Sequence, residues 1–237
     1  MRRVLITGAA GGIGADMVRH FARDHAVTAS DLPSDALEAL GRETGATVVP
    51  CDLGDPDDIA ALAAAATADG LDVLVNNAAT YKLRPWLEID AAEFDRITAV
   101  NQRGTFLLSQ ACHPALRASG TGRIVNVTSN TFFKGWEGLM TYVATKGGIT
   151  GMSRVIAREV GGDGITVNCV APGAIPTAAE DHHPDPEGFH RMLMEFQAVK
   201  RRGSTDDIAR AVAFFAHPDN GFVTGQTLIV DGGGMMQ

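Results

Sequence analysis

Four side chains in the middle of the chain have the types and spacing that suit proton transfer at an alcohol or carbonyl oxygen. Tyr142 and Lys146 stand four residues apart, so both lie on one face of a helix expected over residues 141–160. Ser129 precedes the tyrosine by 13 residues, and Asn101 lies in a long helix expected over residues 91–117. A tyrosine can act as general acid or base, but its ordinary pKa is about 10, and a nearby ammonium group lowers it. A serine hydroxyl can bind the reacting oxygen and stabilise charge that develops there.

Taken alone, a tyrosine and a lysine four residues apart are more often an ordinary pair on a helix surface. The chain holds only two tyrosines, Tyr81 and Tyr142. A tyrosine that has both a serine and a lysine at these spacings is therefore less easily explained by chance. The further motifs along the chain favour the chemical interpretation over the surface pair.

A glycine-rich turn follows the first expected strand. Residues 7–14 read T-G-A-A-G-G-I-G and lead directly into a helix. Glycine lets the backbone come close to a ligand, and a helix N-terminus with free N–H groups suits a pyrophosphate. A plain glycine turn is the alternative, but the strand–turn–helix context favours dinucleotide binding. The pattern is neither G-x-G-x-x-G nor a triphosphate loop, because no Gly-Lys-Ser/Thr follows.

An acidic residue ends the second expected strand. Asp31 stands 17 residues after Gly14, and a carboxylate there can accept hydrogen bonds from the ribose hydroxyls of an adenosine. It would repel a 2′-phosphate, and its neighbours Leu32 and Pro33 carry no positive charge. The alternative role of Asp31 is to cap the next helix. The position favours NAD over NADP.

Short apolar runs alternate with helical patterns along the whole chain, which predicts an α/β fold with a doubly wound parallel sheet of about seven strands and helices on both faces. We expect a single domain over residues 1–237. The segment at about 174–200 holds three prolines and a cluster of acids and histidines, and we expect it to be an irregular substrate lid. The expected strands lie at residues 4–6, 26–29, 48–49, 73–75, 124–127, 165–170 and 228–230.

Taken together, these motifs resemble the short-chain dehydrogenase/reductase family over nearly the whole chain. The resemblance rests on T-G-x-x-x-G-I-G at 7–14, N-N-A-A at 76–79, S-(12 residues)-Y-x-x-x-K at 129–146, P-G-x-x-x-T at 172–177 and D-G-G at 231–233. The family usually has glycine where this chain has Ala79. By resemblance, Tyr142 donates or accepts the proton, Lys146 lowers its pKa and holds the nicotinamide ribose, Ser129 orients the substrate oxygen, and Asn101 helps a proton relay through water.

The same resemblance implies which residues bind the NAD cofactor. They come from the glycine turn, the ends of the second, third and fourth strands, the catalytic helix and the segment after the sixth strand: Gly8, Gly11, Gly12, Ile13, Gly14, Asp31, Leu32, Asp52, Leu53, Asn77, Ala78, Ala79, Tyr142, Lys146, Pro172, Gly173, Ile175 and Thr177.

The segment Ser129–Lys146 is similar to members that oxidise alcohols on aromatic or heteroaromatic rings, such as pyridoxal 4-dehydrogenase and 1-phenylethanol dehydrogenase. Aromatic residues in it could line an apolar substrate pocket or could pack against a neighbouring helix or subunit, and the sequence favours neither. The candidate substrate residues are Asn130, Thr131, Trp136 and Phe189.

Composition excludes several classes of protein. The net charge is −8 and the densest basic run, at residues 200–202, is short, so we expect no nucleic-acid partner. No apolar run approaches the ~18–20 residues of a membrane span, and none suits a signal peptide. The three cysteines lack metal or disulfide spacing, which predicts buried free thiols and a cytoplasmic location. The acids and histidines at 180–183 fit a solvated loop better than a metal site, and we expect no metal.

The predicted function is therefore NAD-dependent hydride transfer between a small, aromatic or heteroaromatic alcohol and its carbonyl. A 3-oxoacyl-thioester reductase is the alternative within enzymes, and a non-catalytic dinucleotide sensor is the alternative of another class. The resemblance also implies a homo-oligomer, a tetramer in many family members.

Overall fold

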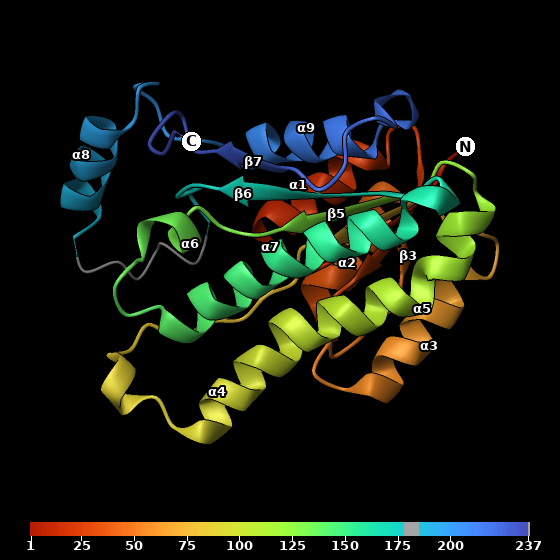
Figure 1. Ribbon diagram of the computed structural model, residues 1–237, viewed down its shortest axis with the longest axis horizontal. Coiled ribbons are helices and arrows are strands. Elements are labelled where there is room, and N and C mark those ends of the chain that lie inside the picture. Colours follow the sequence, from red (N-terminus) through yellow and green to blue (C-terminus); the bar gives the residue numbers. More distant parts are fainter. Residues whose placement is uncertain (178–184, 237) are drawn as a thin grey trace.

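The computed structural model describes residues 1–177 and 185–236, and these residues form one seven-stranded parallel sheet with helices on both faces (Figure 1). The strand order is β3-β2-β1-β4-β5-β6-β7, so the chain starts near the middle of the sheet and reverses direction between β1 and β4. The strands are β1 (Arg3–Thr7), β2 (Ala26–Ser30), β3 (Thr47–Val48), β4 (Val73–Asn76), β5 (Arg123–Val127), β6 (Thr166–Pro172) and β7 (Thr227–Val230). The predicted fold class is confirmed.

Helices fill most of the connections between the strands in the described ranges. The α-helices are α1 (Gly12–Phe21), α2 (Asp35–Thr44), α3 (Pro56–Thr67), α4 (Ala91–Thr98), α5 (Gly104–Ala118), α6 (Thr131–Lys134), α7 (Met140–Val160), α8 (Pro186–Phe196) and α9 (Thr205–Ala216). Short 3₁₀ turns lie at Trp86–Glu88, Gly161–Asp163 and Pro218–Asn220.

The strands are apolar on both sides because each face of the sheet is covered. In β1, Val4 and Ile6 pack into a core shared with α1, α2 and α9. Leu5, between them, packs into the opposite core, which α3, α5 and α7 complete. Successive side chains of a strand point to opposite faces, so burial on both sides requires the continuous apolar runs seen in the sequence.

The long helix predicted over residues 91–117 is two helices joined by a π-helical turn, Ala99–Arg103. Such a turn inserts a residue into the helix and re-aims the side chains beside it, and π-bulges occur often at functional sites. Asn101 lies inside this turn and is fully buried.

The prediction of an irregular segment over about 174–200 was wrong for its second half, which forms α8. The side chain of Asp185 caps this helix by accepting a hydrogen bond from the Gly188 N–H, and Pro186 occupies the first turn. Asp55 and Pro56 begin α3 with the same cap and proline, as the sequence predicts there. Residues 178–184, including the acids and histidines considered for a metal site, lie outside the described residues.

The carboxyl ends of the strands gather the candidate site at one edge of the sheet. In Figure 1 this edge is on the left, beside α6, α8 and the start of α7. From β1 the chain continues to β2 on one side, and from β4 it continues to β5 on the other side. A crevice therefore forms outside the carboxyl ends of β1 and β4, which is where open α/β sheets bind ligands.

Two further sequence predictions concern bilayers and thiols. No helix in the described ranges combines the length and the hydropathy needed to cross a membrane. Cys51, Cys112 and Cys169 are free and buried, which confirms the predicted buried thiols.

Candidate active site

A cleft of about 500 Å³ opens outside the ends of β1 and β4. Most of the predicted cofactor residues line it: Gly8, Gly11, Ile13, Asp31, Leu32, Asp52, Leu53, Asn77, Ala78, Ala79, Tyr142 and Thr177. Tyr81 and Arg96 also line it, although the sequence analysis did not select them. The cleft therefore joins the predicted dinucleotide site to the catalytic tyrosine.

The glycine turn is shaped for close approach of backbone to ligand. Gly8 has φ +67°, and a Cβ there would stand 2.7 Å from the Cα of Ala78. A Cβ on Gly14 would collide with the carbonyl of Gly8, whereas Gly11 borders open space. No side chain in the described ranges caps α1, so its first N–H groups are available. Free N–H groups at an uncapped helix start fit the pyrophosphate of a dinucleotide.

The carboxylate of Asp31 is held by the backbone at the adenosine end of the cleft. One oxygen accepts a hydrogen bond from the N–H of Ala10 at 2.8 Å, and the other accepts from the N–H of Leu32 at 2.7 Å. Its alternative role as a helix cap does not apply, because Ser34 caps α2. The remaining lone pairs of the carboxylate can accept hydrogen bonds from vicinal ribose hydroxyls.

Asp52 lies farther along the same end of the cleft and is paired with Arg96 of α4. The nearest guanidinium nitrogen stands 3.0 Å from a carboxylate oxygen of Asp52. Burial raises the pKa of the Asp52 carboxyl, but the Gly54 N–H and the Arg96 guanidinium together hold it below its usual value. No local sequence signal marks Arg96, because its role depends on α4 lying against the loop after β3.

Tyr142 and Lys146 meet on one face of α7, as their spacing predicts. The Lys146 Nζ lies 5.5 Å from the centroid of the Tyr142 ring and donates a hydrogen bond to the carbonyl of Val127 at 2.7 Å. Burial lowers the pKa of Lys146 to about 8.

Burial also dominates the titration of the tyrosine. It raises the pKa of Tyr142 to about 12, partly opposed by a hydrogen bond from Ser129 and reinforced by the neighbouring Tyr81. The lowering of this pKa by Lys146 that the resemblance implies is not seen, since burial, Ser129 and Tyr81 account for the shift. The phenol is protonated at neutral pH and can donate a proton.

Ser129 lies beside Tyr142 and is held by the first turn of α6. Its Oγ accepts hydrogen bonds from the Thr131 N–H at 3.2 Å and from the Thr131 hydroxyl at 2.8 Å. Asn130 is buried, and its Nδ2 donates to a carboxylate oxygen of Asp231 at 3.0 Å. Thr131 thus supports the serine and Asn130 bonds to Asp231, and a substrate contact of either residue stays a prediction.

Asn101 fastens the loop after β4 to the catalytic helix. Its Oδ1 accepts from the Thr80 N–H at 2.8 Å, and its Nδ2 donates to the Thr80 carbonyl at 2.9 Å and to the Thr145 hydroxyl at 3.1 Å. In this structure Asn101 positions neighbouring segments, and the water relay implied by resemblance stays a prediction.

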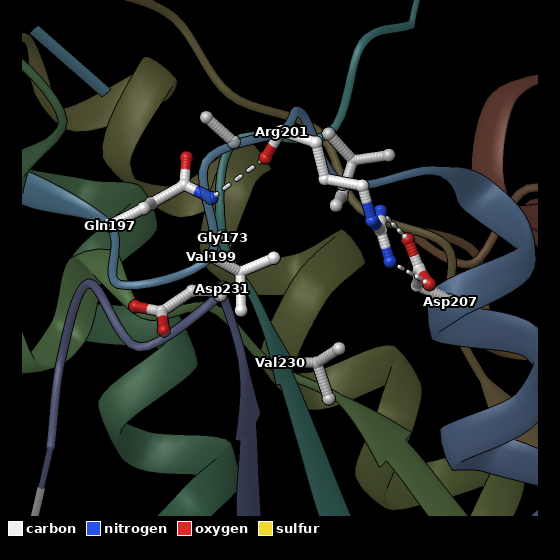
Figure 2. Close-up of a pocket in the computed structure, with 11 residues that line it drawn as sticks. Gly173, Gln197, Val199, Arg201, Asp207, Val230 and Asp231 are labelled. Carbon is white, nitrogen blue, oxygen red and sulfur yellow. Dashed lines mark hydrogen bonds and ion pairs between the residues drawn. The ribbon is translucent and has the colours of Figure 1, made fainter. Parts of the chain in front are cut away.

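The segment after β6 divides between two cavities. Thr177 lines the main cleft, but Gly173 and Ile175 line a separate cavity of about 250 Å³ between β7 and residues 197–203 (Figure 2). Figure 2 shows the Arg201 guanidinium paired with Asp207, at 2.7 Å, so its charge is already compensated. Gly173 and Ile175, predicted to contact the cofactor, therefore do not line the main cleft.

Two of the predicted substrate residues contact each other. The rings of Trp136 and Phe189 lie 6.3 Å apart, edge to face, and so join the loop before α7 to α8. The guanidinium of Arg202 lies 5.8 Å from the Phe189 ring. Trp136 also lines a groove of about 880 Å³ with Leu83, Arg84 and Met140.

No cluster of three or more His, Cys, Asp or Glu residues with the arrangement of a metal site is present in the described part of the chain.

Comparisons with a family model, with known proteins and with solved structures agree with one another. The family model described as enoyl-(acyl carrier protein) reductase matches residues 8–234. The chain is 38% identical to the (2S)-[(R)-hydroxy(phenyl)methyl]succinyl-CoA dehydrogenase subunit BbsD of Thauera aromatica, covering 98% of this chain and 96% of that one. It is 34% identical to the D-xylose 1-dehydrogenase of Caulobacter vibrioides, covering 98% and 95%. A solved structure described as a short-chain alcohol dehydrogenase from Sinorhizobium meliloti 1021 superposes with a TM-score of 0.90 at 32% identity, covering 98% and 95%.

Proposed function

The chain belongs to the short-chain dehydrogenase/reductase family, whose members act on alcohol or carbonyl groups with an NAD(P) dinucleotide, and we propose that this one uses NAD and a small ring-bearing alcohol. The observation that carries the proposal is that one cleft joins Tyr142 to the glycine turn and Asp31, with Lys146 and Ser129 both in contact with the tyrosine. The relative from Thauera aromatica, whose name places the reacting hydroxyl beside a phenyl group, supports the ring-bearing class.

Each of the three residues has its own role in the proposed reaction. When bound, the nicotinamide ring of the dinucleotide would accept or supply the hydride. The hydroxyl of Tyr142 gives a proton to a carbonyl oxygen in reduction, and its phenolate takes one from an alcohol oxygen in oxidation. The hydroxyl of Ser129 orients the same oxygen and stabilises charge on it. The ammonium of Lys146 stabilises the phenolate form of Tyr142 and can bind a ribose hydroxyl.

The test is formation of NADH or NADPH, followed by absorbance, with a panel of ring-bearing and alkyl alcohols and either NAD⁺ or NADP⁺. We expect turnover of a ring-bearing alcohol with NAD⁺. Activity with NADP⁺ alone would overturn the cofactor proposal, and tight dinucleotide binding without any turnover would favour the non-catalytic sensor.

A 3-oxoacyl-thioester reductase is the second candidate, because the matching family model carries an acyl-carrier-protein name. Asp31 and the net charge of −8 count against it, since such a reductase commonly uses NADPH and meets an acidic carrier. Reduction of acetoacetyl-thioester with NADPH would establish this alternative.

The cofactor preference predicts the behaviour of Asp31 variants. We expect wild type to use NAD⁺ at least about 100-fold better than NADP⁺ in kcat/KM, because a carboxylate and a 2′-phosphate repel each other at short range. In Asp31→Asn this ratio is expected to fall by about tenfold or more. The same charge change at exposed Asp69, Asp69→Asn, should leave the ratio unaltered. An unchanged ratio in Asp31→Asn would contradict the assigned role.

Assembly and location form a further part of the proposal. We propose a cytoplasmic location and a homotetramer, and the tetramer is supported by apolar side chains exposed on three helices: Phe94 of α4, Phe106 of α5 and Val155 of α7. Light scattering is expected to give four times the chain mass, and Val155→Glu, in the middle of α7, is expected to give smaller species.

A further inference from the structure

Tyr81 presents an exposed aromatic ring at the catalytic end of the cleft. The residue is 45% exposed and lines the same cleft as Tyr142. The two ring centroids lie 5.6 Å apart with the planes inclined by 61°, an edge-to-face contact. The ring of Tyr81 therefore borders the space into which the catalytic hydroxyl must bring its substrate.

The loop that carries Tyr81 is fastened on both sides of it. Before it, the N–H and carbonyl of Thr80 both bond to the Asn101 side chain. After it, the N–H of Arg84 donates to the carbonyl of Gly138 at 2.8 Å, in the loop that leads to α7. A loop with backbone bonds on both sides holds its side chain in a narrow range of positions.

A buried carboxylate reinforces this loop. The side chain of Glu93 is 5% exposed, and its Oε2 lies 3.3 Å from the Nζ of Lys82 and 3.5 Å from the Nε of Arg84. A carboxylate is seldom so buried unless it is paired, and losing its partners would leave an uncompensated charge. Glu93 thus binds both of the cations that follow Tyr81 in the loop.

We propose that Tyr81 is a specificity-determining residue that selects substrates with an aromatic ring on the reacting carbon, with Glu93 positioning it through Lys82 and Arg84. The inference rests on the proposed function and names the group that contacts the ring. Because the hydroxyl of Tyr142 must reach the substrate oxygen, a substituent on the same carbon comes within reach of the adjacent Tyr81 ring. Aromatic rings attract each other in offset and edge-to-face arrangements, whereas a short alkyl group gains less from the same contact.

Binding of two ketones to the enzyme–NAD⁺ complex tests this without requiring turnover, because NAD⁺ has no hydride to give. Calorimetry with acetophenone and with 2-butanone compares a ring with an ethyl group on the same carbonyl. We expect Tyr81→Leu to weaken the binding of acetophenone about fivefold and the binding of 2-butanone by less than about twofold. Tyr81→Phe keeps the ring and should retain the affinity for acetophenone. Phe222→Leu removes a ring at a fully exposed site and should change the affinity for neither ketone.

The positioning role has its own variant. Glu93→Gln keeps the size of the side chain and removes its charge. We expect this variant to bind acetophenone about threefold more weakly and 2-butanone with nearly unchanged affinity. The exposed neighbour variant Glu88→Gln should leave both affinities as in wild type.

Equal weakening of both ketones in Tyr81→Leu, or no weakening of either, would overturn the proposal, as would a wild type that binds acetophenone no better than 2-butanone. Failure of the proposed function would give a different result. A wild type that binds acetophenone in a Tyr81-dependent manner but oxidises no alcohol would refute the dehydrogenase activity while supporting the ring-binding site.

Discussion

Replacing Tyr142 with phenylalanine is expected to lower kcat by about 10³-fold while dinucleotide affinity stays within about twofold of wild type. The phenol is protonated at neutral pH because burial raises its pKa to about 12, so it is the group that can give a proton to a carbonyl oxygen. Ser129 can donate a hydrogen bond to that oxygen but has no comparable means of transferring its proton. The measurements are turnover by NADH absorbance and NADH affinity by fluorescence.

The neighbouring Thr141 offers a matched control for Tyr142→Phe. Its hydroxyl is buried and has no hydrogen-bond partner in the described part of the chain. Thr141→Val also removes one hydroxyl from α7, and we expect it to leave turnover unchanged and stability equal or slightly higher. Turnover in Tyr142→Phe within about tenfold of wild type would show that another group carries the proton.

The parts of the site that the sequence predicts are those whose geometry is local. The glycine turn, the Asp31 position and the spacing of Tyr142 and Lys146 each lie within one element or at its end, so strand and helix geometry alone places them. Their convergence follows from the parallel sheet, because carboxyl ends of parallel strands meet at one edge.

The parts that the sequence does not predict depend on how distant segments pack. Arg96 reaches Asp52 because α4 crosses the loop after β3, and Tyr81 reaches Tyr142 because two loops are bonded to each other. Asn130 was expected at the substrate, but Asp231, 101 residues later, holds its amide. No spacing rule within a segment reveals such contacts.

The helix α8 has a start signal in the sequence. Asp185-Pro186 begins α8 as Asp55-Pro56 begins α3, and in both places the aspartate side chain caps the helix. The prolines and histidines before residue 185 favour an irregular segment, whereas Asp185-Pro186 is a helix-start signal. The cap-and-proline signal is equally informative at both positions.

Lys146→Met is expected to abolish turnover and yet to make the fold more stable at neutral pH. Lys146 is 2% exposed, and burial lowers its pKa to about 8 from an ordinary value of 10.5. Below pH 8 the group is charged in both states, so the folded state bears the full cost of burying the charge. A shift of this size corresponds to about 3 kcal/mol, and loss of the hydrogen bond to the Val127 carbonyl offsets about 1–2 kcal/mol of the gain.

The sign of the pH dependence separates this explanation from simple repacking. Between pH 8 and 10.5 the unfolded chain binds a proton that the folded chain has released, so the stability of wild type rises with pH in that window. Methionine does not titrate, so the advantage of the variant is greatest below pH 8 and shrinks toward pH 10.5. Urea unfolding at several pH values measures it, with a melting temperature expected to rise by about 4 °C at pH 7.

Lys200→Met is the matched control, because Lys200 is exposed and its Nζ bonds to backbone carbonyls near the end of α8. That variant loses the same charge without relieving any burial, so we expect no stabilisation at any pH. A Lys146→Met protein that is less stable than wild type at pH 7 would mean that the ammonium group is compensated inside the fold. In that case the lysine would be part of the packing of the site, and its retention would need no catalytic explanation. A more stable but inactive variant would instead show that the chain keeps a destabilising charge next to Tyr142 for its chemistry.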